Sequence, residues 1–403
     1  MPKYTYFARD PYGHPVRGTM IAENEAELSE RLRNLGYVLT RVKAVKEKIT
    51  AELPRKRKRL NPKELLNFTI HLATLINSGV PLLPSLTNLA KSTGGSYAQT
   101  IISGIRKRVE AGSSLKDAIS SYPRSFPKLY VAILGAGEAT GKLGTVLSDL
   151  ASYLEWQLDL RSKVKEASTY PIILFTVMIL VVIILLVRVI PAFESLFQEM
   201  DIALPLPTQI ILNLSSFIRN FWYLFLLGIG ILVFAYKFYQ KYPKGRYNID
   251  SLKLKLPLFG TILRKVALSR FCHTMSLTLA SGMGLLPALV LGAEVVGNER
   301  LNQVVLTAKE SINVGEKLAS SLALSKEFPP LVVTMIEVGE ESGTLIQSFD
   351  KVNQFYDKEV PSTIRRFFTV FEPLMIIFMG IVVGGIALSV LLPLIRLIEA
   401  VGG

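Results

Sequence analysis

Three long apolar stretches interrupt a chain that is otherwise rich in charged residues. They cover residues 171–190, 219–240 and 373–396, and the first contains a single charged residue, Arg188, near one end. About 20 residues with a rise of about 1.5 Å each are enough to cross a hydrocarbon core of about 30 Å. The pattern therefore predicts three transmembrane helices.

Basic residues flank these stretches unevenly. Residues 191–218 contain acidic side chains but no Lys or Arg, whereas Lys and Arg are frequent before the first span, after the second and before the third. Because Lys and Arg accumulate on the cytoplasmic side, we expect a multi-pass inner-membrane (plasma-membrane) protein with 191–218 and 397–403 in the periplasm. Residues 1–16 contain no apolar core of signal-peptide length, so we expect the N-terminus in the cytoplasm.

The two predicted cytoplasmic regions repeat one another. Matching residues recur at a constant spacing, which shortens by one residue part of the way along, and each copy ends by entering a predicted span. This pattern indicates a duplicated unit of helical bundle plus transmembrane helix. The matched positions that we single out are Gly79 with Gly282, Pro84 with Pro287, Gly112 with Gly315, Gly137 with Gly339, Glu138 with Glu340, Gly141 with Gly343, and Pro171 with Pro373.

Apolar residues within each copy follow helical spacing, and Gly and Pro separate short helical segments. This is the pattern of an antiparallel helical bundle. At the N-terminus, side chains alternate from Tyr4 to Ala8, and a helical pattern ends at Gly36, which predicts a small α+β module. The predicted class is mainly α: a polytopic membrane protein with two homologous cytoplasmic antiparallel bundles, three transmembrane helices and this module.

The predicted domains follow from these patterns. Residues 55–61 carry a run of Lys and Arg, which we interpret as a solvated linker beside anionic membrane lipid. In chain order, the domains are the α+β module (1–54), the basic linker (55–61), bundle 1 (62–170), span 1 (171–190), a periplasmic loop (191–218), span 2 (219–240), bundle 2 (241–372), span 3 (373–396) and a periplasmic tail (397–403).

Composition agrees with membrane spans joined to solvated domains. Half of the 403 residues are hydrophobic, the mean hydropathy is +0.36, and 46 basic against 32 acidic residues give a net charge of +14. Positive cytoplasmic loops and anionic lipid explain this excess more simply than nucleic acid, so no nucleic-acid partner is expected. The single cysteine, Cys272, excludes an internal disulfide framework and a zinc site built from several cysteines.

The best candidate for catalytic chemistry is the glycine-rich segment from Gly135 to Leu143, which resembles a phosphate-binding loop. Its spacing differs from that of a Walker A sequence, which requires Ser or Thr where Leu143 stands. Its second copy contains no lysine. We therefore interpret it as a helix–helix turn capped by glycine.

Other reactive residue types are scattered. His14, His71 and His273 are isolated in the sequence and are expected to be structural, and Cys272 is expected to be a small buried hydrophobe. Glu138 and Glu340 recur in both copies, where a helix cap is favoured over a cation site. We expect no cofactor, no metal site and no enzymatic activity.

Several short motifs together resemble the type II secretion system F domain family (PilC/GspF). Individually they are weak, but the resemblance covers nearly the whole chain. They are residues 72–83, 112–115, 126–127, 137–143 and 170–171 in the first copy and 328–330, 339–343 and 372–373 in the second.

The resemblance implies an inner-membrane platform protein of type IV pilus assembly. Its implied partners are a hexameric secretion or pilus-assembly ATPase, pilin or pseudopilin subunits and other inner-membrane assembly proteins, and it implies a homo-oligomer. A platform of a type II secretion system is the alternative within the family. A membrane transporter built from repeats, and a membrane-anchored enzyme, are the alternatives from other classes.

Overall fold

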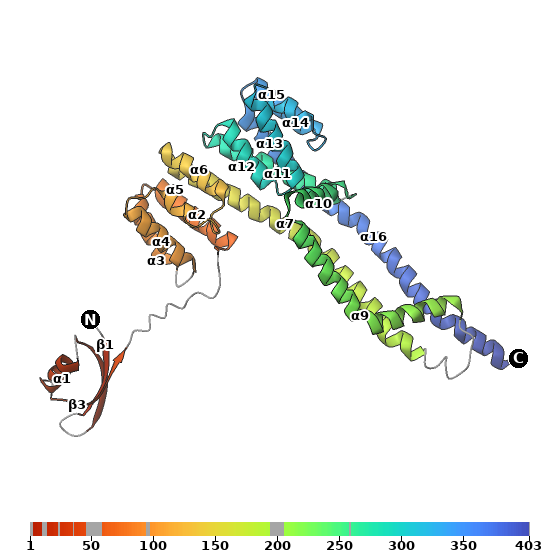
Figure 1. Ribbon diagram of the computed structural model, residues 1–403, viewed down its shortest axis with the longest axis horizontal. Helices are drawn as coiled ribbons and strands as arrows, with labels where there is room; N and C mark the ends of the chain where they lie inside the picture. Colours follow the sequence, from red (N-terminus) through yellow and green to blue (C-terminus); the bar gives the residue numbers. More distant parts are fainter. Residues whose placement is uncertain are drawn as a thin grey trace.

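The structure is a computed structural model that describes residues 3–9, 14–22, 25–34, 36–45, 59–93, 97–193, 205–257 and 259–402 (Figure 1). Near the N-terminus, three strands form an antiparallel sheet in the order β2-β1-β3, and the apolar face of α1 contacts it through Leu28 and Leu32. Residues 10–13, which separate β1 from β2, and most of the predicted linker, 55–58, lie outside the described residues. The elements are β1 (Lys3–Arg9), β2 (Pro15–Ile21), α1 (Glu25–Asn34) and β3 (Val38–Val45).

The first bundle consists of short helices that pack onto the start of a long one. Its first helix, α2, begins after Asn61, whose backbone N–H donates to the Glu64 carboxylate at 2.7 Å. This bond satisfies a donor that has no partner within the helix. Leu72, Leu86 and Ile119 are completely buried in the core. The helices are α2 (Pro62–Asn77), α3 (Leu82–Ser92), α4 (Tyr97–Glu110), α5 (Leu115–Ser120) and α6 (Lys128–Ala139).

The second bundle repeats the first helix by helix, from α11 to α15, and is preceded by α10. Its core is built around Phe271 and Phe349, which meet edge to face with ring centroids 6.0 Å apart. The predicted mainly helical, duplicated fold is therefore confirmed. The helices are α10 (Pro243–Lys255), α11 (Phe259–Ala280), α12 (Leu285–Val295), α13 (Glu299–Asn313), α14 (Leu318–Ala323) and α15 (Pro330–Glu341).

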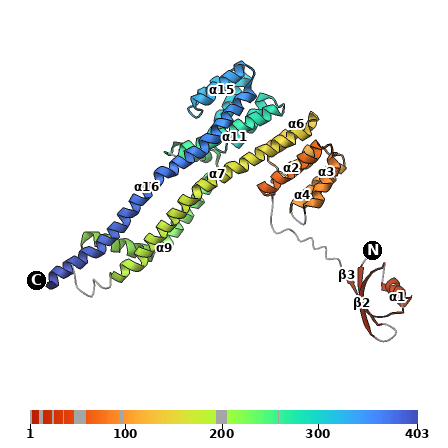
Figure 2. The same cartoon turned by 180° about the vertical axis from the view of Figure 1, so that it is seen from behind.

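Three long helices lie side by side and extend away from the bundles (Figures 1 and 2). Two segments are long and apolar enough to cross a membrane, Leu143–Phe193 and Leu345–Pro393. The third predicted span falls in the remaining long helix, whose apolar stretch Leu227–Tyr239 is shorter and whose backbone is non-helical at Phe221. The helices are α7 (Leu143–Ile184), which continues into the π-helical segment η1 (Leu185–Val189), α9 (Leu206–Tyr239) and α16 (Leu345–Gly402).

The predicted borders between bundle and span coincide with no break in the backbone. Residues 170 and 171 both lie inside α7, and residues 372 and 373 both lie inside α16, which also includes most of the predicted tail 397–403. The change at each border is one of environment, because exposed apolar side chains such as Ile172 and Leu374 begin directly after it. Each bundle is thus joined to its apolar segment by one continuous helix.

Candidate functional site between the two repeats

Matched glycines end helices in the same way in both copies. Gly79 and Gly282 have φ values of 81° and 83°, in the left-handed region that other residues rarely adopt. The amide that follows Gly79 binds the carbonyl of Leu75 at 3.0 Å, which closes α2 with a Schellman motif. Four further positions that we singled out also have positive φ: Gly112, Gly141, Gly315 and Gly343.

A different requirement explains the matched pair Gly137 and Gly339. A Cβ at Gly137 would lie 2.7 Å from the Cβ of Val146, and one at Gly339 would lie 2.7 Å from the Cβ of Ser348. Both distances are too short for carbon atoms, so only glycine lets α6 approach α7 and α15 approach α16. These glycines therefore position the short helices on the long ones.

The matched glutamates bind the N-termini of short helices. Glu138 accepts hydrogen bonds from the backbone N–H groups of Leu115 at 2.7 Å and Lys116 at 3.0 Å. Glu340 binds Leu318 at 2.7 Å and Ala319 at 3.1 Å in the same way. A carboxylate is favourable there because the first amides of a helix lack intrahelical partners and carry partial positive charge. Both oxygens of each carboxylate are therefore used in capping.

The matched prolines occupy two kinds of position. Pro84 and Pro287 are the third residues of α3 and α12, where a backbone N–H has no partner within the helix. Pro171 and Pro373 lie inside α7 and α16, just before the exposed apolar segments. Each of these interior prolines removes one backbone hydrogen bond from its long helix at the predicted membrane surface.

The segment that resembles a phosphate-binding loop is a turn between two helices. Gly135 and Gly137 lie in α6, Gly141 forms the turn, and Leu143 begins α7. A phosphate-binding loop follows a strand, whereas residues 128–184, all of which are described, contain only helices and this turn. The geometry supports the predicted glycine cap.

The two hydrophobic cores meet at Trp156 on α7. This side chain packs partly buried against both cores, and its ring stacks on the His273 ring with centroids 3.7 Å apart. Its Nε1–H donates to the Asp357 carboxylate at 2.8 Å, and His273 Nε2 lies 3.3 Å from the same oxygen. We call Trp156, His273 and Asp357 the inter-repeat joint.

Sequence reasoning missed this joint. His273 was expected to be an isolated structural residue, and nothing in its spacing indicates Trp156 or Asp357 as neighbours. The remaining reactive side chains do not take part: His14 and His71 are exposed and distant in the chain, and Cys272 is completely buried. Burial raises the pKa of the Cys272 thiol, which keeps it in the unreactive protonated form. Among the described residues, no cluster of three His, Cys, Asp or Glu side chains is arranged to hold a metal ion.

The joint is expected to weaken in acid. Burial by itself raises the pKa of Asp357, but hydrogen bonds from His273 and Trp156 outweigh burial and leave this pKa below its usual value of about 3.8. A lowered pKa means that the charged carboxylate stabilises the fold at neutral pH, and that this contribution is lost as the pH falls through the folded-state pKa. When the pH is lowered from about 6 to about 3, the thermal unfolding midpoint should therefore fall less in Asp357→Asn than in the wild type.

Glu155 provides the matched control, since it occupies the equivalent position in the first copy and is exposed. Glu155→Gln should keep the wild-type pH dependence. If the unfolding midpoint fell equally with pH in the wild type and in Asp357→Asn, this carboxylate would not stabilise the joint.

A second contact between the repeats lies nearer the apolar segments. Tyr170 donates its hydroxyl hydrogen to the Glu372 carboxylate at 3.1 Å. These residues directly precede the matched prolines, so equivalent positions of the two copies face each other where α7 and α16 meet. The motifs at 170–171 and 372–373 were singled out from the sequence, but their mutual contact was not predicted.

These features define a duplicated helical membrane protein whose two copies contact each other along two long helices. The chain matches the family described as "Type II secretion system (T2SS), protein F" over residues 68–191 and 271–393, and that family's N-terminal domain over residues 1–43. The two matched stretches coincide with the two copies. The chain therefore belongs to the type II secretion system protein F family, as its motifs predicted.

Relatives cover almost the full length of the chain. A type IV pilus assembly protein PilC from Thermus thermophilus is 36% identical over 401 residues, which is 99% of this chain and 98% of the relative. A PilC of Myxococcus xanthus is 34% identical over 400 residues, 99% of this chain and 96% of the relative. A type II secretion system protein F from Pseudomonas aeruginosa is 30% identical over 407 residues and covers 100% of both chains.

Proposed function

We propose that this chain is the inner-membrane platform protein of type IV pilus assembly and that it has no catalytic role. In this function, a hexameric cytoplasmic ATPase moves the helical bundles, and the membrane helices transmit that movement to pilin subunits entering the fibre. Other inner-membrane assembly proteins would surround a homo-oligomer of the chain. The PilC relatives from Thermus thermophilus and Myxococcus xanthus support pilus assembly in particular.

The observation that carries this proposal is the continuity of the two long helices. α7 has 42 residues and α16 has 58, which correspond to roughly 63 Å and 87 Å at the usual helical rise. Each begins in a bundle core and continues into an apolar segment. A continuous helix transmits displacement along its axis better than a flexible linker, so movement of a bundle would reach the membrane.

We also propose three membrane crossings, with the N-terminus in the cytoplasm and the C-terminus in the periplasm. The third crossing would be supplied by α9, whose exposed side chains are mostly apolar and which lies beside α7 and α16 (Figures 1 and 2). The part of α9 that follows the non-helical Phe221 has 18 residues and reaches roughly 27 Å, which is close to the thickness of a hydrocarbon core. Its basic end, near Lys237 and Lys241, is then cytoplasmic.

The proposal is tested by interrupting a helix between bundle and membrane. A Gly-Gly-Ser insertion after Ala167 should abolish pilus assembly in cells while leaving capture of the assembly ATPase by the purified full-length chain unchanged. The same insertion after Lys241, in the turn between α9 and α10, is the matched control and should preserve both. Comparing the wild type with a chain lacking residues 1–59 shows whether the N-terminal module provides the ATPase contact.

The gene knockout separates the two family functions. Loss of pili with normal protein secretion supports the pilus platform, whereas loss of secretion with normal pili supports the type II secretion alternative suggested by the Pseudomonas aeruginosa relative. Normal pili and normal secretion, together with no captured ATPase, would overturn the platform proposal.

A further inference from the structure

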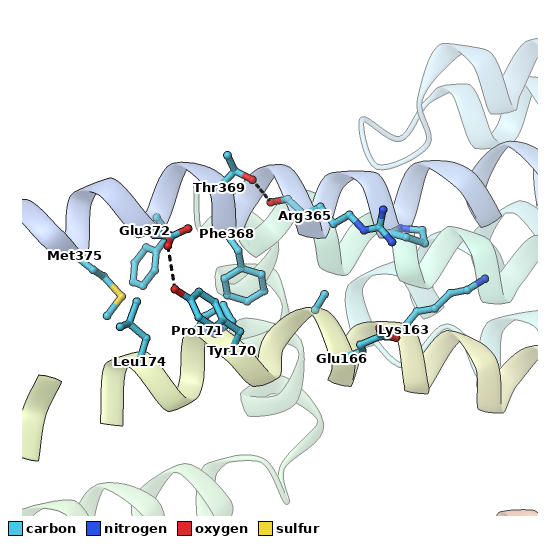
Figure 3. Close-up of a pocket in the computed structure, with 13 residues that line it drawn as sticks. Lys163, Glu166, Tyr170, Pro171, Leu174, Arg365, Phe368, Thr369, Glu372 and Met375 are labelled. Atoms are coloured by element: carbon cyan, nitrogen blue, oxygen red, sulfur yellow. Dashed lines mark hydrogen bonds between the residues drawn. The ribbon is translucent and has the colours of Figure 1, made fainter. Parts of the chain in front are cut away.

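A cleft opens between α7 and α16 where the proposed membrane surface lies (Figure 3). Its volume is about 470 Å³, within the range of pockets that hold small molecules. It is open at the side, and both of its walls are provided by these two helices. The cleft lies beyond the inter-repeat joint, in the direction of the apolar segments.

Equivalent residues of the two copies face each other across this cleft. Lys163 and Arg365 occupy the same position in the two repeats, as do the hydrogen-bonded residues Tyr170 and Glu372. The cleft therefore lies between equivalent segments of the two copies. Such a position brings like charges together, because a cation retained in both copies meets its own counterpart.

The chemistry of the cleft changes along its length. Figure 3 shows Lys163 and Arg365 at one end, Tyr170 and Glu372 in the middle, and apolar side chains at the other end. Lys163 forms an ion pair with Asp159 at 2.6 Å, whereas Arg365 forms no ion pair with any described residue. A cation without a carboxylate partner favours an anion beside it, and the Lys163 ammonium has further N–H donors for the same anion.

Both carboxylates of the cleft narrow the choice of ligand. Glu166 lies one helical turn from Lys163 and is exposed, and Glu372 holds the Tyr170 hydroxyl. With two cations and two carboxylates, the lining has no net charge. A purely anionic ligand would meet repulsion from the carboxylates, whereas a zwitterion that carries both a phosphate and an ammonium group matches both signs.

We propose that this cleft binds one phosphatidylethanolamine molecule at the cytoplasmic membrane surface. Its phosphate lies between Lys163 and Arg365, its ammonium group donates to Glu166, and its acyl chains extend toward Leu174 and Met375. The inference rests on the membrane placement proposed above, because only that placement puts the cleft at headgroup level. A lipid bound there would tie the two repeats together where their long helices enter the bilayer.

The test is native mass spectrometry of the purified full-length chain, delipidated and then titrated with phosphatidylethanolamine, phosphatidylcholine or phosphatidylglycerol. The wild type should hold one phosphatidylethanolamine more tightly than either other lipid. Lys163→Ala with Arg365→Ala should weaken that binding roughly tenfold, the expected loss for charge-assisted hydrogen bonds. Glu166→Gln should reduce the preference over phosphatidylcholine, whose quaternary ammonium group has no N–H to donate.

The matched control removes the same charges from neighbouring positions. Lys165 and Arg366 lie at the same level on the same helices, are exposed and do not line the cleft. Lys165→Ala with Arg366→Ala should bind lipid like the wild type. Lys163→Arg with Arg365→Lys keeps both cations and should also retain binding, which separates loss of charge from loss of folding.

The proposal fails if both double-alanine variants bind equally, or if bound lipid simply follows the composition of the mixture. Either result would mean that lipid surrounds the helices without a specific site. Lipid binding is measured without any assembly partner, so its result does not depend on whether the chain acts as a platform protein. Retained lipid in a chain that captures no ATPase would contradict only the platform proposal.

Discussion

Replacing Trp156 by alanine is expected to separate the two helical bundles. The variant removes the side chain that packs against both hydrophobic cores, together with its stack on His273 and its hydrogen bond to Asp357. Truncating a fully buried aromatic side chain costs about 3–5 kcal/mol; because Trp156 is only half-buried, we expect a loss of about 2–3 kcal/mol. Thermal unfolding of the detergent-solubilised protein should show a lower midpoint, or two transitions where the wild type has one.

The same variant should also lose pilus assembly while the chain remains in the membrane at a normal level. Trp156→Phe is the control, because it keeps one aromatic ring for stacking and packing and loses the N–H donor together with the smaller ring of the indole. We expect it to lose about 1 kcal/mol, the usual contribution of one hydrogen bond. A Trp156→Ala protein that unfolds like the wild type and still assembles pili would show that the joint does not hold the bundles together.

Removing the matched glutamates should destabilise both bundles by similar amounts. Glu138→Ala leaves the first two amides of α5 without their carboxylate, and Glu340→Ala does the same to α14. Leaving a buried donor unsatisfied costs about 1–3 kcal/mol; because these hydrogen bonds are only partly buried, or exposed at Lys116, each variant should lose about 1 kcal/mol of unfolding free energy. The two losses should agree, because the hydrogen-bond lengths are nearly identical in the two copies.

Glu341 provides the control for this pair of variants. It lies next to Glu340 but is exposed, and its carboxylate pairs only with the exposed Lys317. Hydrogen–deuterium exchange should show faster exchange at residues 115–116 in Glu138→Ala and at residues 318–319 in Glu340→Ala. Glu341→Ala should leave both segments unchanged. If Glu340→Ala and Glu341→Ala behaved alike, the capping role of Glu340 would be wrong.

The internal repeat shows which features of the fold could be predicted from the sequence. Glycines at matching positions indicated helix ends, and Gly79 and Gly282 do end α2 and α11. Local rules suffice there, because a left-handed residue at a helix end depends on the backbone and very little on distant contacts. The same rules predicted that Glu138 and Glu340 cap helices. They did not predict which helices these residues cap. Each binds a helix that begins more than 20 residues earlier in the chain.

Such local rules could not predict the contacts between the two copies. Trp156 and Asp357 are far apart in sequence and occupy positions that do not match in the repeat, so neither spacing nor duplication relates them. Tyr170 and Glu372 do match, yet a repeat by itself does not say whether equivalent residues touch. That depends on how two long helices cross, which is a property of packing between distant segments.

By itself, the sequence determined the duplication, the helical character of both bundles, the apolar segments and the family, because each depends on local composition, periodicity or residue-by-residue similarity. Only the tertiary structure decided that bundle and apolar segment share one continuous helix and that Trp156 connects two cores. It also decided that a cleft of balanced charge lies between the copies. The physical reason is that these features arise from side chains brought together by folding, whose free energies depend on distances in space and not on separation along the chain.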